Sequence, residues 1–156
     1  MEVFQEAVSK IVAIQEIDHL TEKFYECVCF STEHYPKVDQ LKDLFYDAGR
    51  MVNNNFDVPL ELTAQSYAQA LIKQIEDSNV EFNSQIEISD ITEVFGRMAQ
   101  RISVFEYSST PSNLQPWKRG VNYIQYVYIN GRWLISSMIW SDEKDNCPIP
   151  ESYLAG

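Results

Sequence analysis

The sequence predicts an α+β domain in which helices pack against an antiparallel sheet. Two observations carry this prediction. Apolar residues recur at helical spacing through the first half of the chain, whereas alternating β-branched and aromatic residues dominate from Val80 onwards. Helices that precede all the long strands, rather than alternating with them, are typical of α+β folds. No internal repeat or linker divides the chain, so residues 1–156 are predicted to form one domain.

Three helices are expected before the long strands. The first spans about residues 4–28, where apolar side chains recur every three or four positions. The second begins near Pro36, because proline suits the first turn of a helix. Thr63 can cap the third helix, whose inner stripe covers residues 67–75. A short strand at residues 49–53 is expected between the second and third helices.

The strands that follow end in a hairpin with an unusual composition. Alternating patterns mark strands near residues 80–88 and 94–108, and a loop rich in Ser, Pro and Asn precedes the hairpin. The dipeptide Asn130-Gly131 predicts a two-residue turn that places Ile129 opposite Arg132. Counting from that register, both faces of the hairpin carry large apolar residues. One face is predicted to meet the helices and the other a second copy of the sheet, because burying one large side chain is worth about 1.5–3 kcal/mol.

Composition argues against several classes of function. The net charge of −11 disfavours binding to nucleic acid, since an acidic chain repels phosphates. No apolar run approaches the roughly 20 residues that span a bilayer, and the N-terminus does not resemble a signal peptide. These features predict a cytoplasmic protein with no membrane partner. Three cysteines and two histidines without metal-ligand spacing, together with the absence of a glycine-rich phosphate loop, predict neither metal nor cofactor.

Three segments carry a resemblance to a known family. They are "RGVNYIQYVYINGRWLISSMIWSDE", "FGRMAQRISVFEY" and "LFYDAGRMVNN". In this order of elements the chain resembles the nuclear transport factor 2-like superfamily, which includes ketosteroid isomerases, scytalone dehydratase and polyketide cyclases of the SnoaL type. The resemblance implies a cone-shaped fold in which three N-terminal helices pack on a strongly bent antiparallel sheet. It also implies an apolar pocket inside the cone and a homodimer formed by the outer sheet face.

The resemblance also implies site residues. "IWSDE" is similar to the Trp-Ser-Glu that ends the last strand of ketosteroid isomerases, where the tryptophan lines the pocket. Trp140 would then be a pocket wall, with Tyr25 and Gln125 as polar handles. The full set of expected pocket residues is Tyr25, Met51, Asn53, Tyr123, Gln125, Ser136, Met138 and Trp140. The opposite face of the hairpin gives the expected dimer interface, Tyr126, Tyr128, Trp133 and Ile135.

The catalytic groups of ketosteroid isomerase do not carry over completely. The base would fall within residues 51–55, which contain no carboxylate, and the acid of the oxyanion hole would fall near Gln125. Only Tyr25 matches. Glu106 and His34 remain as further acid–base candidates, although the favoured explanations are a salt-bridged or edge-exposed glutamate and a surface loop histidine.

Three function classes therefore stay open. The favoured one is a protein that binds a small apolar ligand in the cone pocket without the isomerase aspartate. The alternatives are a cofactor-independent dehydratase, isomerase or cyclase, and a dimeric adaptor for protein interactions. An enzyme needs at least one titratable group inside the cone, whereas a binding protein needs none.

Overall fold

The computed structural model describes residues 2–31, 34–77, 82–109 and 117–155, and side chains from residue 9 onwards. The elements follow in the order helices, short strands, helix and long strands, as the sequence predicts. They are α1 (Glu2–Val28), α2 (Val38–Leu41), the 3₁₀ turn η1 (Lys42–Leu44), β1 (Phe45–Asn53), β2 (Leu60–Leu62), α3 (Ala64–Asp77), β3 (Ser84–Phe95), β4 (Met98–Ser108), β5 (Lys118–Ile129), β6 (Arg132–Asp142) and α4 (Glu151–Leu154).

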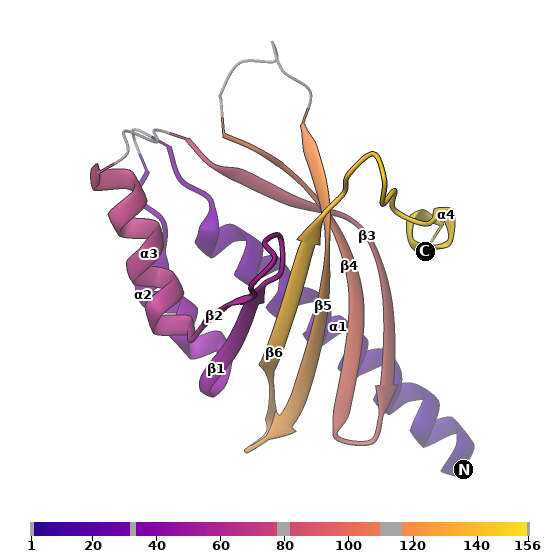
Figure 1. Cartoon of the computed structure of the whole chain (residues 1–156). Coiled ribbons are helices and arrows are strands. Elements are labelled where there is room, and N and C mark those ends of the chain that lie inside the picture. The colour runs from indigo at the N-terminus through magenta and orange to yellow at the C-terminus, as the bar shows by residue number, and fades with distance from the viewer. Residues whose placement is uncertain (1, 32–33, 78–81, 110–116, 156) are drawn as a thin grey trace.

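The strands form one six-stranded sheet in the order β2-β1-β6-β5-β4-β3. The helix α1 crosses one side of the sheet, and α3 lies beside β1 (Figure 1). All neighbouring strands are antiparallel except β1 and β6, which run parallel. The expected purely antiparallel sheet is therefore mixed. The long connection from β1 through β2, α3, β3, β4 and β5 supplies the crossover that parallel pairing requires.

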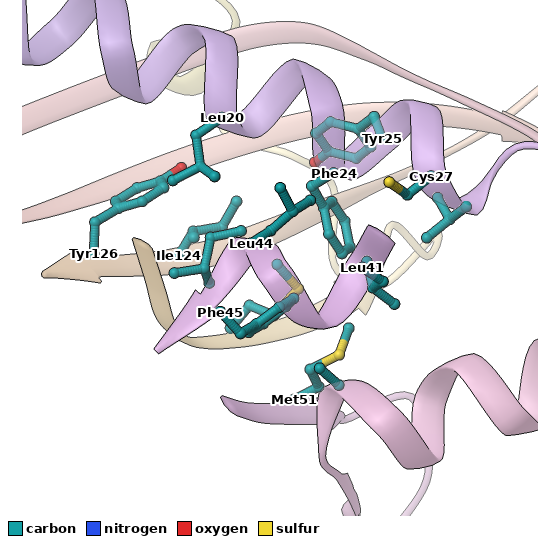
Figure 2. Close-up of a cluster of buried hydrophobic side chains, with 14 of the residues drawn as sticks. Leu20, Phe24, Tyr25, Cys27, Leu41, Leu44, Phe45, Met51, Ile124 and Tyr126 are labelled. Carbon is teal, nitrogen blue, oxygen red and sulfur yellow. The ribbon is translucent and has the colours of Figure 1, made fainter. Parts of the chain in front are cut away.

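The core lies between α1 and the inner face of the sheet. Ile17, Leu20 and Phe24 form a buried stripe on α1, because residues three and four apart share one face of a helix. Leu20 and Phe24 face Ile124 and Tyr126 of β5 across this core (Figure 2). The third helix begins as expected: the Thr63 hydroxyl accepts a hydrogen bond from the Ser66 N–H at 3.1 Å, which confirms Thr63 as its cap.

One extra residue in β6 determines which side chains enter this core. Ile129 lies opposite Arg132, which confirms the predicted register at the turn. Farther along, Tyr126 pairs with Ile135 but Gln125 pairs with Ser137, so Ser136 is a β-bulge. A bulge reverses the alternation of side chains beyond it. Trp133 and Ile135 on one side of the bulge, and Met138 and Trp140 on the other, therefore all belong to the inner face.

The bulge overturns the predicted dimer interface. Tyr126, Trp133 and Ile135 are buried against the helices, with exposed fractions of 1%, 7% and 0%. Tyr128 is half-buried, with its ring centroid 5.3 Å from that of Trp133. These residues form part of the core. The prediction placed them on the outer face because a count back from the turn does not include the bulge. The outer face instead carries Tyr123, Gln125 and their neighbours.

A second irregularity lies beside the first. In β1, Phe45 pairs with Ile135 and Arg50 with Ser137, so the four residues between them on β1 bulge away from β6. Gly49 lies in this bulge with a φ of +73°, where a Cβ atom would meet the Phe45 ring at 2.6 Å. Only glycine fits there without strain. Adjacent bulges in β1 and β6 bend the sheet at one level.

Two short elements were not expected from the sequence. The strand β2 extends the sheet beyond β1. The helix α4 packs on β3 and β4 at the C-terminal end of the chain, where the Ser89 hydroxyl donates to the Tyr153 carbonyl at 2.6 Å. Within the described part of the chain, no helix combines the length and apolar character needed to cross a membrane.

Deleting Ser136 should unfold the protein or cost it several kcal/mol of stability. Without the bulge, either Trp133 and Ile135 or Met138 and Trp140 must leave the core. Each large side chain is worth about 1.5–3 kcal/mol, against a total stability of about 5–15 kcal/mol. Ser136→Ala keeps the residue count and should stay within about 1 kcal/mol of the wild type.

Urea unfolding followed by circular dichroism measures both variants. A deletion variant with wild-type stability would show that the bulge does not determine the faces of β6.

Candidate functional site

A cavity of about 390 Å³ opens between the inner face of the sheet and the helix α3. The ends of β1, β4 and β6 and the starts of β3 and β5 reach it, and β2 closes one side. Its volume lies within the range of small-molecule pockets, about 300–1,000 Å³. Antiparallel strands bring residues from both ends of the chain together here, so the site combines groups that are far apart in sequence.

Aromatic rings form much of the wall. Tyr67 of α3 and Trp140 of β6 meet edge to face, with centroids 5.9 Å apart. Phe105 and Tyr107 line the wall from β4, and Phe24 lines it from α1. Burial raises the pKa of Tyr67 to about 12, so its hydroxyl remains protonated at neutral pH. Such a wall suits a flat, largely apolar molecule.

Carboxamide side chains supply most of the polar lining. The cavity is therefore more polar than the apolar pocket that the sequence resemblance implied. Asn53 Oδ1 accepts the N–H of Asn55 at 3.1 Å, and Asn55 Oδ1 accepts the N–H of Asp142 at 2.6 Å. Asn83 Nδ2 donates to the carbonyl of Val28 at 2.9 Å. Because each partner is a backbone group of fixed polarity, the orientation of each amide is fixed as well.

Asn122 differs from the other amides because it is buried and only half satisfied. Its exposed fraction is 4%, and its Nδ2 donates to the Tyr25 hydroxyl at 3.1 Å. Its Oδ1 is buried without a hydrogen-bond partner among the described residues, although Asn122 lines the cavity. A buried polar atom without a partner costs about 1–3 kcal/mol. Asn122 Oδ1 is therefore a strong candidate for contact with a ligand.

A chain of hydrogen bonds connects Asn122 to a buried charge. The Tyr25 hydroxyl lies 2.7 Å from Ser103 Oγ, and Ser103 Oγ donates in turn to Glu87. Arg101 donates to both carboxylate oxygens of Glu87. Burial raises the pKa of Tyr25 above its ordinary value, so its hydroxyl stays protonated. We name these five residues, Arg101, Glu87, Ser103, Tyr25 and Asn122, the buried relay.

Arg101 anchors the buried relay. Its side chain is 3% exposed, and its guanidinium pairs with Glu87, with Asp18 at 2.6 Å and with Asp90 at 3.4 Å. Burial lowers the pKa of Arg101, but the hydrogen bonds and charge of Glu87 outweigh burial and raise the pKa above its ordinary value. The buried cation thus keeps its carboxylate partners in place between α1, β3 and β4.

Among the described lining residues, one carries a carboxylate. Asp142 lines the cavity and accepts a hydrogen bond from the Tyr107 hydroxyl at 2.7 Å. Burial, followed by the hydrogen bond and charge of Asp142, raises the pKa of Tyr107 above its ordinary value. The described lining residues include no Lys, Arg or His. The charge of the cavity therefore favours neutral or cationic ligands over anions.

The structure brings three of the eight expected pocket residues to the cavity, Asn53, Met138 and Trp140. Tyr25 and Met51 lie in the adjoining core (Figure 2). Tyr25 cannot serve as the expected polar handle because its hydroxyl bonds within the buried relay.

The other three expected pocket residues lie elsewhere. Tyr123 and Gln125 are exposed on the outer face, because on β5 the inner side chains are those of Asn122, Ile124 and Tyr126. Ser136 is the bulge residue, and its hydroxyl donates to the carbonyl of Gln125 at 3.1 Å. The bulge thus leaves the β6 assignments of Met138 and Trp140 intact while reversing those on β5.

The weak acid–base candidates do not meet in the cavity. Glu106 is half-buried opposite Arg119 on the outer side of β4, and His34 is exposed. The candidate functional groups that sequence reasoning missed are Asn122 and Asp142. Asn122 lies on the same face of β5 as Ile124 and Tyr126. An asparagine among apolar residues on one strand face was the sequence signal that could have indicated its importance. Among the described residues, no group of three or more His, Cys, Asp and Glu side chains could hold a metal ion.

Comparisons with known proteins identify the fold. No family model matches the sequence, and no curated protein matches it. An NTF2-like protein with a cystatin-like fold from Novosphingobium aromaticivorans is similar in structure, with a TM-score of 0.73 and 10% identity over 97% of this chain and 93% of that chain. A Nostoc punctiforme protein of unknown function with a cystatin-like fold gives a TM-score of 0.64 and 14% identity over 84% and 91%.

A third similar structure carries a provisional description as an enzyme. It is a Novosphingobium aromaticivorans protein provisionally described as a scytalone dehydratase, with a TM-score of 0.62 and 15% identity over 88% of this chain and 89% of that chain. At these identities the likeness concerns the fold alone. The chain has the α+β, cystatin-like fold of NTF2-like proteins, which confirms the fold that its sequence resemblance predicted.

Proposed function

We propose that this protein binds a small, neutral, largely apolar molecule in the cavity beneath α3. The observation that carries the proposal is a cavity of about 390 Å³ whose lining includes Asn122, a buried residue whose Oδ1 has no hydrogen-bond partner among the described residues. Natural proteins rarely leave such an atom without a partner, and a ligand or an ordered water would supply one. Aromatic walls and a few oriented amides fit this role.

The residues that line the cavity also argue against isomerase chemistry as the first candidate function. Residues Asn53 and Asn55 reach the cavity from the end of β1, near the place where the resemblance puts the isomerase base. An amide is not a base at neutral pH, whereas a carboxylate is. These amides are instead suited to orienting a ligand.

A cofactor-independent dehydratase, isomerase or cyclase is the second candidate function. One observation favours it, the Asp142 carboxylate on the cavity wall beside the Tyr107 hydroxyl. A carboxylate at the edge of an apolar cavity can accept a proton from a bound substrate. Asp142→Asn separates the two functions, because it removes the base while conserving shape and most hydrogen bonds.

Trp140→Ala should weaken binding of the neutral reporter N-phenyl-1-naphthylamine about tenfold, because it removes an aromatic wall worth roughly 1.4 kcal/mol or more. The fluorescence of the reporter measures its affinity. Trp117→Ala is the matched control, since Trp117 is exposed outside the cavity. Asp142→Asn should retain binding. Equal affinities for the wild type and Trp140→Ala would place the reporter elsewhere.

We also propose that the outer face of the sheet pairs with a second copy of the chain. Ile102, Tyr123 and Ile139 line a groove there, and Tyr123 and Ile139 are 48% and 39% exposed. The exposed Arg50 and Glu61 beside it pair with each other. A two-fold contact places the same patch on both subunits, and this patch carries little net charge despite the −11 of the whole chain. Such a dimer is also the unit that an adaptor function would require.

Ile139→Asp should convert the dimer to a monomer, because it buries a carboxylate at the centre of the contact. Light scattering across a range of concentrations measures the mass. Ile86→Asp, an exposed isoleucine on β3 outside the groove, should remain dimeric. A wild-type protein that is monomeric at every concentration contradicts the proposal.

A further inference from the structure

We infer that the ligand must donate a hydrogen bond to Asn122 Oδ1, which selects hydroxyl-bearing molecules such as phenols over ketones and ethers. This inference rests on the proposed binding function and adds the chemical class of the ligand. It depends on the direction of each hydrogen bond in the buried relay.

The direction of the hydrogen bonds is set at the charged end of the buried relay, where Arg101 meets Glu87. Arg101 has only N–H donors, and it donates to both oxygens of Glu87, so Glu87 acts there as an acceptor. The Ser103 hydroxyl donates its single proton to Glu87. Ser103 Oγ can then act only as an acceptor toward Tyr25, which lies 2.7 Å away.

The same logic continues to the cavity. Because the proton of the Tyr25 hydroxyl is used for Ser103, its oxygen can only accept, and Asn122 Nδ2 donates to it at 3.1 Å. Rotating the Asn122 amide by 180° would place Oδ1 against an oxygen that has no free proton. The amide is therefore locked with Oδ1 as its unpaired atom, on a residue that lines the cavity.

The fixed orientation of the Asn122 amide selects for ligands that donate a hydrogen bond. A hydroxyl or N–H group of a ligand would satisfy Asn122 Oδ1, whereas a carbonyl or ether oxygen would face it without a proton. The carboxylate of Asp142 and the absence of cationic side chains among the described lining residues disfavour anions. Aromatic walls favour a flat ring. Together these features describe a neutral aromatic alcohol.

The experiment titrates 4-fluorophenol, 4-fluoroanisole and 4-fluorotoluene into the full chain and measures binding by ¹⁹F NMR. The three probes share a ring, but only the phenol carries a donor. We expect the wild type to prefer 4-fluorophenol to 4-fluoroanisole by about five- to tenfold, the worth of one net hydrogen bond.

Two variants test the origin of that preference. Asn122→Leu removes the acceptor, and Ser103→Ala frees the Tyr25 proton so that the amide can rotate. Each should reduce the preference for the phenol to about twofold or less. Ser137→Ala is the control, because Ser137 bonds to Gln125 outside the buried relay and should keep the wild-type preference.

The outcomes separate the inference from the function on which it rests. If the wild type binds all three probes without preferring the phenol, or if both variants keep the preference, the inference fails and the binding function stands. If the wild type binds none of the probes, the proposed function fails for small aromatic molecules and the inference fails with it. Should the variants not fold, the preference of the wild type between 4-fluorophenol and 4-fluoroanisole still decides.

Discussion

The buried guanidinium of Arg101 is the interaction on which the rest of the site depends. A cation taken out of water must be paired, and breaking such a pair costs about 3–5 kcal/mol. Arg101 on β4 is satisfied by Glu87 and Asp90 on β3 and by Asp18 on α1. The ion pairs therefore fix the position of the long helix on the sheet.

That anchoring has a chemical consequence at the other end of the buried relay. Once Glu87 is held as an acceptor, Ser103 and Tyr25 have no choice of hydrogen-bond direction, and Asn122, which lines the cavity, keeps its Oδ1 unpaired. A structural ion pair thus determines the polarity of the proposed binding site through three neutral side chains. The arrangement is a network in which each member is satisfied except at the point where a ligand would bind.

Much of the fold could be predicted from the sequence, because it follows from local patterns. The helical spacing, the cap at Thr63 and the Asn130-Gly131 turn each act within a few residues, and the structure shows all of them. The bulge at Ser136 leaves no comparable local signal. Its position depends on pairing with β5 and β1, so the faces of the hairpin could not be assigned by counting from the turn.

The site was predictable only in part for the same reason. The prediction for Trp140 agrees with the structure because it came directly from the family resemblance. The predictions for Tyr123 and Gln125 depended on the strand register, and both residues lie on the outer face. Asn122 owes its role to burial and to partners far away in the chain, such as Tyr25. Neither burial nor the direction of a hydrogen bond can be read from sequence spacing.

A crystal structure of the complex with 4-fluorophenol tests the central claim most directly. We predict the phenol ring between the aromatic walls, with its oxygen about 2.5–3.0 Å from Asn122 Oδ1. A ring bound in the cavity whose hydroxyl points to Asp142 or to solvent, with Asn122 Oδ1 still unpaired, would contradict the account.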